Sequence, residues 1–209
     1  MQQSAFRFES GFKFRRHLSP PRVQCQSAAV ESANDHVTGG IIGMENLVIR
    51  AGTPADRADL LRGVMALQDY EAGLHETRLP AASCGEAYLD WMLGQVREQQ
   101  GCCYLAFQAG AFVGFVAGWV ERIESVAETA DSTVFGYISD ICILPGWRRQ
   151  GLAQVLLAAA EGYLRAQGVR RLRIGSLAGN QAAVAAYRSA GFQPYEIILE
   201  KVLAEAIAG

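Results

Sequence analysis

Short apolar runs alternate with stretches in which apolar residues recur at helical spacing, and this pattern predicts a mixed α/β domain. The runs predict strands at residues 47–51, 102–108, 111–120, 132–144, 171–177 and 194–202. The helical spacing predicts helices at residues 53–70, 85–99, 152–167 and 180–190. The turn signal Ala109-Gly110 joins two strands in a hairpin. Antiparallel strands followed by alternating strands and helices indicate one central sheet.

Three glycines recur every four residues across this hairpin: Gly110, Gly114 and Gly118. In a membrane helix such spacing would indicate a dimer seam. In a hairpin it permits twist, bulging and close packing of strands, which is the interpretation we favour.

A basic loop follows the strand that contains Ile141, Cys142 and Ile143, and it leads directly into a helix at Leu152. The loop carries two arginines and a glycine at the helix entrance. Free amide groups and the positive end of the helix dipole therefore meet basic side chains, which predicts a phosphate site. The nucleotide P-loop is excluded because Leu152 and Ala153 stand where Lys and Ser/Thr are required.

Two motifs resemble those of the GCN5-related N-acetyltransferase (GNAT) superfamily. Arg148-x-x-Gly151-x-Ala153 resembles its pyrophosphate loop, [Q/R]-x-x-G-x-[G/A]. Downstream, a strand, Asn180 opening a helix, Tyr187 near the helix end, and then Gly191-Phe192 resemble its C-terminal signature. The resemblance covers most of residues 46–201 and implies a single-domain GNAT fold, with a central mixed, mostly antiparallel sheet and about four flanking helices.

The resemblance also implies the donor, acetyl-CoA, and the residues that bind it. In the family two neighbouring strands part, the pantetheine arm lies in the gap, and a bulge leaves backbone groups of one strand unpaired. Transferred to this chain, the binding residues are Ile141, Cys142, Ile143, Arg148, Arg149, Gln150, Gly151, Leu152, Ala153, Gln154 and Asn180. Asn180 has the alternative role of a simple helix N-cap.

The implied reaction is N-acetylation of a primary amine by direct attack, without an acyl-enzyme. Tyr187 is the candidate general acid, because it lies two helical turns after Asn180 and faces the same side; its alternative role is core packing. Asp140 is the candidate general base, with Glu121 and Glu124 as rivals, and its alternative is a strand-edge carboxylate bonded to backbone. A non-catalytic acyl-CoA sensor and a longer acyl donor both stay open.

The acceptor is not defined by the sequence. Acidic residues gather in the segments that line the family's acceptor cleft, namely Asp69, Glu71, Glu76, Glu121, Glu124, Glu128 and Asp131. Such a rim would attract a cationic amine, although a solvated polar loop has the same composition. A small amine, an aminoglycoside, a polyamine and a protein amine all remain candidates, and the oligomeric state is open.

Composition excludes several other classes. The 209 residues are 50% hydrophobic and 19% charged, with a net charge of −2, which argues against a nucleic-acid binder. The longest apolar run, 111–120, is too short to span a bilayer. The five cysteines form no C-x-x-C pair, so neither a disulfide framework nor a metal site is predicted, and Cys142 is interpreted as a packing residue. A reducing, cytoplasmic location is the simplest expectation.

Residues 1–43 lack a sustained hydrophobic period and are set apart from the domain at 44–209. Against one acid, Glu9, the segment carries Arg7, Lys13, Arg15, Arg16 and Arg22. A disordered extension or a mis-called start upstream of Met44 is the expectation, and an organelle transit peptide is the alternative.

Overall fold

The computed structural model describes residues 46–203, so the expectation for residues 1–43 lies outside the described part of the chain. The strands are β1 (Leu47–Ala51), β2 (Cys102–Gln108), β3 (Ala111–Arg122), β4 (Val134–Ile143) and β5 (Leu172–Ile174). The helices are α1 (Arg57–Ala72), α2 (Ala81–Glu98), α3 (Leu152–Ala166) and α4 (Gln181–Ser189), with short 3-10 turns at Pro54–Asp56 and Pro145–Trp147.

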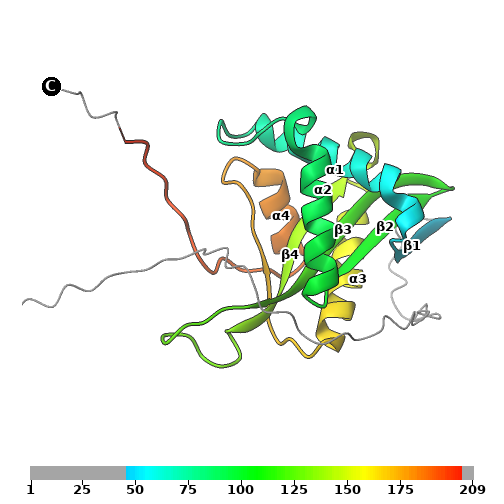
Figure 1. Ribbon diagram of the computed structural model, residues 1–209. Coiled ribbons are helices and arrows are strands. Elements are labelled where there is room, and N and C mark those ends of the chain that lie inside the picture. Colours follow the sequence, from blue (N-terminus) through cyan, green and yellow to red (C-terminus); the bar gives the residue numbers. More distant parts are fainter. Residues whose placement is uncertain (1–45, 204–209) are drawn as a thin grey trace, which may run out of the picture. The chain divides into compact units, whose positions relative to one another are not determined.

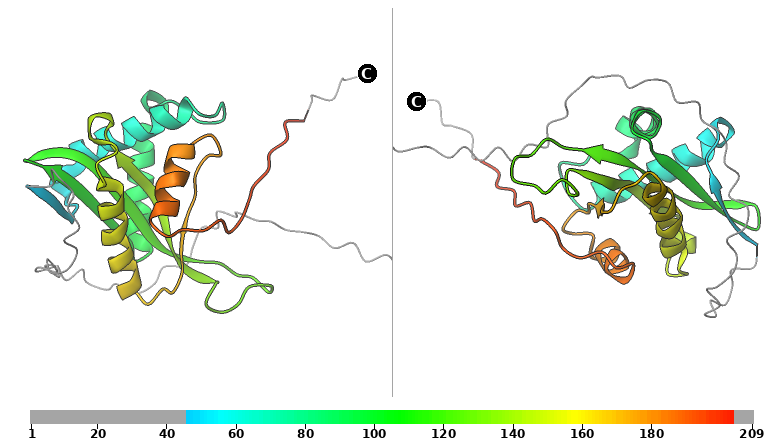
Figure 2. Two further views of the ribbon diagram at one scale, coloured as in Figure 1. Left: turned by 180° about the vertical axis from the view of Figure 1, so that it is seen from behind. Right: turned by 90° about the horizontal axis from the view of Figure 1, so that it is seen from below.

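The five strands form one sheet in the order β1-β2-β3-β4-β5, in which only β5 runs parallel to its neighbour. Helices α1 and α2 cover one face, α3 covers the other, and α4 lies beside the β5 end (Figures 1 and 2). This arrangement confirms the expected mixed, mostly antiparallel sheet with four flanking helices. None of the helices within residues 46–203 is long and apolar enough to cross a membrane.

The sheet is packed on both faces, and β3 shows this most clearly. Every residue from Phe112 to Val120 is buried. Val113 and Val116 belong to the core shared with α3, whereas Phe115 belongs to the core shared with α1 and α2. A strand covered on both sides reads as a continuous apolar run rather than an alternating one, as seen in the sequence.

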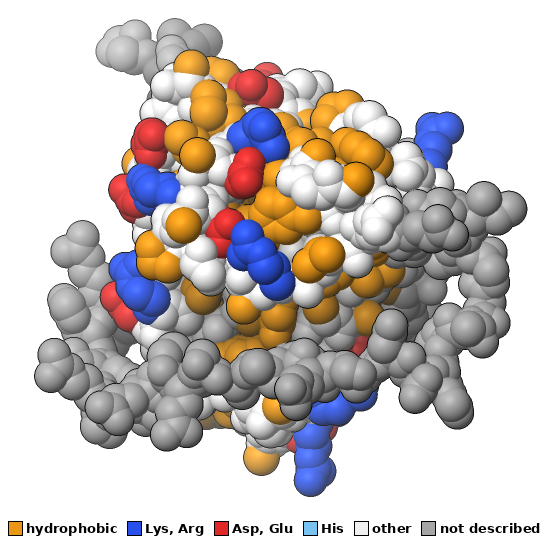
Figure 3. Space-filling view, turned by 90° about the vertical axis from the view of Figure 1, so that its right-hand side faces the viewer, with side chains coloured by type: hydrophobic (Ala, Val, Ile, Leu, Met, Phe, Trp, Pro, Cys, Tyr) orange, Lys and Arg blue, Asp and Glu red, His pale blue; other side chains and the backbone are white. Residues whose placement is uncertain are grey.

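Ion pairs join the two helices of the α1–α2 face. The Arg57 guanidinium contacts Glu86 at 2.8 Å and Asp90 at 2.7 Å. These groups are exposed, so the pairs contribute little to stability. On the face shown in Figure 3, acidic and basic side chains likewise lie near one another among hydrophobic ones.

The glycines of β3 allow a close approach of β4. A Cβ on Gly114 would lie 2.4 Å from the Cys142 carbonyl oxygen, and one on Gly118 would lie 2.7 Å from that of Tyr137. No real Cβ tolerates such contacts with backbone. The interpretation of the four-residue spacing as close packing in a hairpin is therefore confirmed.

Replacing Gly114 by Ala is expected to lower the free energy of unfolding by roughly 1–3 kcal/mol, because the added methyl group must push β4 away. The measurement is the urea midpoint of unfolding. Gly146→Ala is the control, since a Cβ there meets nothing within 4 Å, and it should change stability by no more than about 0.5 kcal/mol. Equal midpoints for the two variants would contradict the close approach.

The last strand predicted from the sequence, at 194–202, is not a strand. Residues 193–203 have no regular secondary structure, and the apolar side chains of this segment are exposed. Its residues have strand propensity, but a strand also needs a neighbour to pair with, and no described segment pairs with it. The strand at 171–177 is also shorter than expected, because β5 ends at Ile174.

Candidate active site

A bulge in β4 and the early end of β5 together leave part of β4 unpaired. Along β4 the register with β3 moves from Ile138–Gly118 to Asp140–Ala117, so Ser139 is an extra residue. Pairing between β4 and β5 stops at Ile138. From residue 139 to 143, β4 thus has an edge that no described strand covers, and its outward amide and carbonyl groups can bind a ligand.

The predicted pantetheine-binding residues Ile141, Cys142 and Ile143 lie on this unpaired stretch. Cys142 is 4% exposed and packs in the core with α1 and α2, whereas Ile141 and Ile143 pack against the α3 core. Burial raises the pKa of the Cys142 thiol to about 11, so the thiol stays protonated near neutral pH. The side chain of Cys142 therefore packs, and its backbone is the part available to a ligand.

The loop between β4 and α3 has the backbone of an anion site. Arg149 and Gly151 both have left-handed φ angles, 63° and 81°, and Gly151 is the N-cap of α3 without a side-chain cap. The first amides of α3, at Leu152 and Ala153, have no acceptor within the helix. Together with the helix dipole, these amides form a positive concavity that suits a phosphate group.

The two arginines of the loop differ in their placement. The Arg148 side chain turns back toward β4: its Nε donates to the Ile143 carbonyl at 3.0 Å, and its guanidinium lies 5.0 Å from the Tyr70 ring centre. Arg149 and Gln150 are exposed, as is Gln154 in the first turn of α3. Arg148 therefore ties the loop to both β4 and α1, and its positive charge lies next to the unpaired stretch.

Asp140 is a buried carboxyl held by two hydroxyl groups. Its side chain accepts hydrogen bonds from the Tyr88 hydroxyl at 2.8 Å and the Ser139 hydroxyl at 2.5 Å, and the residue is 3% exposed. Burial raises the pKa of Asp140 to about 6, although both hydrogen bonds oppose the rise. A carboxyl with this pKa is largely ionised at pH 7 and can take up a proton. The hydrogen-bond partners of the Asp140 carboxyl are side-chain hydroxyls. The alternative role, a strand-edge carboxylate hydrogen-bonded to the backbone, therefore does not describe these contacts.

The rivals of Asp140 lie in different surroundings. Glu121 accepts a hydrogen bond from the Trp119 indole at 2.9 Å, and Glu124 is exposed in the segment between β3 and β4. Of the acidic rim, Asp131 pairs with Arg171 at 2.7 Å and Asp69 accepts from the Ala81 amide at 2.8 Å. Part of the predicted rim is thus used in structural contacts.

Tyr187 and Asn180 come from α4. The Asn180 side chain accepts from the Ala183 amide at 3.1 Å, so it is a helix N-cap, and the Tyr70 hydroxyl lies 3.4 Å from the same oxygen. Tyr187 packs edge-on against Phe192, with ring centres 6.3 Å apart. Burial raises the pKa of the Tyr187 phenol, and the charges of Glu71 and Asp140 raise it further. The phenol is therefore protonated near neutral pH and carries a proton that it can donate.

Glu71 connects these groups electrostatically. Burial is the main cause of the raised pKa values of Asp140, Tyr88 and Tyr187, and the charge of Glu71 raises each of them further. Such effects decline with distance, so the four side chains share one region of the molecule. Burial raises the pKa of Glu71 itself, and Arg78, 3.7 Å away, opposes the rise.

Sequence reasoning missed Tyr88, Ser139 and Arg78. Tyr88 falls within the helix predicted at residues 85–99, and the hydrophobic pattern carries no signal for what its hydroxyl contacts. Ser139 is placed beside Asp140 by the bulge, which only the pairing with β3 defines. Within residues 46–203, no three His, Cys, Asp or Glu side chains gather in a way that could hold a metal ion.

A bulged strand that parts from its neighbour next to an amide-lined basic loop is the arrangement that the resemblance to the GNAT superfamily implies. Residues 66–192 match the model of the acetyltransferase (GNAT) family, so the chain belongs to this family and is an acyl-transferring enzyme. It is 26% identical over 152 residues to aminoglycoside N(6′)-acetyltransferase type 1 of Stenotrophomonas maltophilia, covering 72% of this chain and 89% of that protein. An N-acetyltransferase of Bacillus subtilis, YycN, is 31% identical over 88 residues, 42% of this chain and 54% of that protein.

Solved structures show the same fold. An aminoglycoside 6′-N-acetyltransferase from Acinetobacter haemolyticus has a TM-score of 0.56 and 21% identity, covering 76% of this chain and 99% of that one. Another aminoglycoside N-acetyltransferase, solved in complex with CoA, has a TM-score of 0.57 and 17% identity, covering 75% and 94%. At these identities the likeness concerns the fold alone.

Proposed function

We propose that this enzyme transfers the acetyl group of acetyl-CoA to a primary amine of a small molecule, by direct attack of the amine. The observation that carries the proposal is the unpaired stretch of β4 at 139–143, which leads straight into the anion-binding start of α3. This layout suits a long ligand with a diphosphate at one end and a thioester at the other.

The residues fit the donor along its length. Amides around Gly151, Leu152 and Ala153 would hold the diphosphate, with Arg149 and Gln150 at the exposed rim. The outward backbone groups of Ile141 to Ile143 would pair with the amide groups of the pantetheine arm. An amide near Cys142 would polarise the thioester carbonyl as negative charge develops on its oxygen. Asn180, which caps α4, would lie across the gap from this strand.

Asp140 and Tyr187 would move the two protons of the reaction. When bound, acetyl-CoA supplies a thioester whose carbonyl carbon accepts the amine and whose sulfur departs. The Asp140 carboxylate would take a proton from the amine, directly or through water, so that its nitrogen carries a lone pair. The Tyr187 phenol would give its proton to the departing sulfur. One C–N bond forms and one C–S bond breaks. The acylated nitrogen would then lose its second proton to the Tyr187 phenolate, directly or through water, and Asp140 would release the first proton to solvent.

Aminoglycosides are the first acceptors to test. The relative from Stenotrophomonas maltophilia, which aligns over 89% of its length, is named for that activity. An aminoglycoside carries several positive charges, which negative side chains attract. The negative charges of Glu71 and Asp140 are close enough to Tyr187 to raise the pKa of its phenol. Other small primary amines remain in the same class.

The decisive experiment incubates the purified protein with acetyl-CoA and a panel of amines, and follows release of the CoA thiol. The panel contains aminoglycosides, polyamines, simple primary amines and a lysine peptide. Thiol release that depends on a small amine supports the proposal. If the protein binds acetyl-CoA but releases no CoA thiol with any amine, it is a non-catalytic binder. If calorimetry detects no binding of acetyl-CoA, the proposed acetyl-CoA site does not exist.

Gly151→Val is expected to weaken acetyl-CoA binding by roughly tenfold or more, since a side chain strains the left-handed residue that shapes the loop. Gly168→Val is a matched control, because Gly168 follows the other end of α3 with a φ of 86°. Both variants carry the same kind of backbone strain, but only Gly151 adjoins the proposed diphosphate site. The dissociation constant, measured by calorimetry, should change for the first variant alone; equal losses would indicate an effect on α3 rather than on the loop.

A further inference from the structure

Ser139 reverses the alternation of side chains along β4, because it is the extra residue of the bulge. Before the bulge, Ile138 packs into the core shared with α3, and after it Cys142 packs into the core shared with α1 and α2. In a regular strand these two residues would share one face. The extra residue therefore turns Asp140 toward α2, whose Tyr88 hydroxyl bonds to its carboxyl.

The Asp140 carboxyl is closed to a ligand by the two hydroxyls that hold it. The residue is 3% exposed, its Oδ1 accepts from the Tyr88 hydroxyl, and its Oδ2 accepts from the Ser139 hydroxyl. An amine in the gap beside β4 would have to displace one of these hydroxyls to reach the carboxyl. A proton therefore passes to Asp140 most readily through a hydroxyl that already bonds to it.

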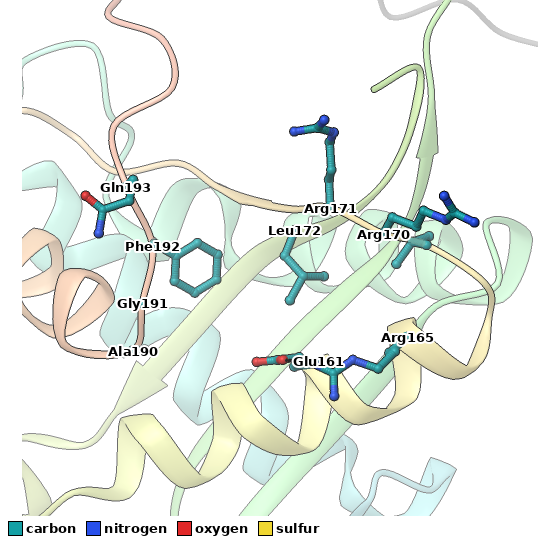
Figure 4. A pocket seen from close by; sticks show the side chains of 10 residues that line it. Glu161, Arg165, Arg170, Arg171, Leu172, Ala190, Gly191, Phe192 and Gln193 are labelled. Atoms are coloured by element: carbon teal, nitrogen blue, oxygen red, sulfur yellow. Dashed lines mark hydrogen bonds and ion pairs between the residues drawn. The ribbon is translucent and has the colours of Figure 1, made fainter. Parts of the chain in front are cut away.

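The open hollow on the side of β5 away from β4 gives no second path to Asp140. Figure 4 shows Leu172 and Phe192 facing each other across this hollow, above Glu161 and Arg165 of α3. Among the described residues, none of the groups whose charge or hydrogen bond acts on Asp140 lines the hollow. The access that the structure offers is the unpaired edge of β4, which is also the proposed site of acetyl-CoA.

The Ser139 hydroxyl, rather than that of Tyr88, belongs to this edge. Ser139 is half-buried and begins the stretch at 139–143 that no described strand covers. Tyr88 extends from α2, and its ring packs against Trp91 with ring centres 5.3 Å apart. A serine hydroxyl donates one hydrogen bond and accepts two. Ser139 can therefore bond to Asp140 and accept a hydrogen bond from an amine at the same time.

Charged and titratable groups face Asp140 from each neighbouring element. They are Glu71 of α1, Arg78 between α1 and α2, Tyr88 of α2, Cys103 of β2, Tyr137 and Cys142 of β4, and Tyr187 of α4. Burial raises the pKa of Asp140, and the hydrogen bonds from Ser139 and Tyr88 oppose the rise. Loss of either hydroxyl should therefore raise the pKa of Asp140 further, whereas loss of a proton relay should slow the reaction at every pH.

We propose that the Ser139 hydroxyl carries the proton of the acceptor amine to Asp140, an inference that rests on the proposed N-acetyltransferase function. The ammonium would donate to Oγ of Ser139 while the Ser139 hydroxyl donates to Oδ2 of Asp140. The N–H bond of the ammonium and the O–H bond of Ser139 break, and new O–H bonds form at Ser139 and at Asp140. The amine gains its lone pair, Ser139 ends unchanged, and Asp140 holds the proton, so the step needs no further reactant.

The test is kcat as a function of pH, with acetyl-CoA and the amine that the wild type acetylates. For the wild type, kcat should rise through a midpoint near 6 to a plateau as Asp140 ionises. Ser139→Ala should lower the plateau by about 10- to 10²-fold, since a water must take the place of the hydroxyl, and should also raise the midpoint. Ser139→Thr keeps a hydroxyl and should restore the plateau to within about threefold of the wild type. The dissociation constant of acetyl-CoA should change by less than about twofold in both variants.

Two further variants separate the relay from the tuning of Asp140. Tyr88→Phe removes the other hydroxyl from the same carboxyl, so it should raise the midpoint in the same direction and lower the plateau much less than Ser139→Ala does. Ser132→Ala is the matched control, because the Ser132 hydroxyl also donates to a carboxylate, that of Glu128, but lies outside the unpaired stretch of β4. This control should keep the midpoint and the plateau of the wild type.

Three results would overturn the relay while leaving the proposed function in place, because the wild type turns over in each of them. If Ser139→Ala raises the midpoint but reaches the wild-type plateau, Ser139 is only a positioning residue. If Ser139→Thr loses as much as Ser139→Ala, the shape of the bulge matters and the hydroxyl does not. If Tyr88→Phe lowers the plateau more than Ser139→Ala does, Tyr88 is the relay. A wild-type protein that releases no thiol with any amine would remove the proposed function and the relay together.

Discussion

Replacing Tyr187 by Phe is expected to lower kcat by about 10²-fold or more, while the dissociation constant of acetyl-CoA changes by less than about twofold. The phenylalanine ring keeps the packing against Phe192 but has no proton for the departing sulfur. Burial raises the pKa of Tyr187, so the phenol stays protonated near neutral pH and has a proton to give. Steady-state turnover and calorimetry with acetyl-CoA measure the two quantities separately.

Tyr104→Phe is the matched control for this substitution. Tyr104 is also a partly buried tyrosine, on β2, where it packs edge-on against Tyr163. Loss of its hydroxyl should leave kcat unchanged. If Tyr187→Phe keeps the wild-type kcat, Tyr187 is a packing residue, and another group or water protonates the thiol.

Asp140→Asn is expected to lower kcat by about 10²- to 10⁴-fold, because an amide cannot take a proton from the amine. The substitution keeps the shape, and an amide can still bond to both the Tyr88 and Ser139 hydroxyls. Glu121→Gln, at the rival carboxyl bonded to Trp119, is the control and should have little effect. If Glu121→Gln lowers kcat strongly and Asp140→Asn does not, then Glu121 is the base.

The pH dependence follows from the raised pKa of Asp140. The base must be ionised, so wild-type turnover should increase with pH through a midpoint near 6 and level off above it. Asp140→Asn should lose this ascending limb. The free energy of unfolding has the opposite pH dependence. Between about pH 4 and pH 6, Asp140 holds a proton in the folded state that it has released in the unfolded state. The contribution of Asp140 to the free energy of unfolding is therefore lost as the pH rises through about 6. The variant should therefore be at least as stable as wild type at pH 8, as measured by urea unfolding.

The local features of the loop could be predicted from the sequence because each depends on neighbouring residues. The apolar run before Pro145, the glycine at the helix entrance and the helical period after Leu152 define a strand, a turn and a helix start, and all three lie where expected. The glycine spacing of β3 likewise indicated close packing. The assignments of Tyr187 and Asp140 came from motif resemblance, and their roles stay predictions.

Contacts between distant segments were decided only by the tertiary structure. The register shift between β3 and β4 next to Gly118 produces the bulge at Ser139. The hydroxyl of Tyr88 reaches Asp140 because α2 packs on the neighbouring strand β3. Residues 194–202 have the strand propensity that predicted a strand, yet among the described residues they have no neighbour to pair with. The period of the side chains determines which residues can form a helix or a strand. Hydrogen-bonding neighbours and buried partners that are distant in the sequence determine whether the element forms and what its polar groups contact.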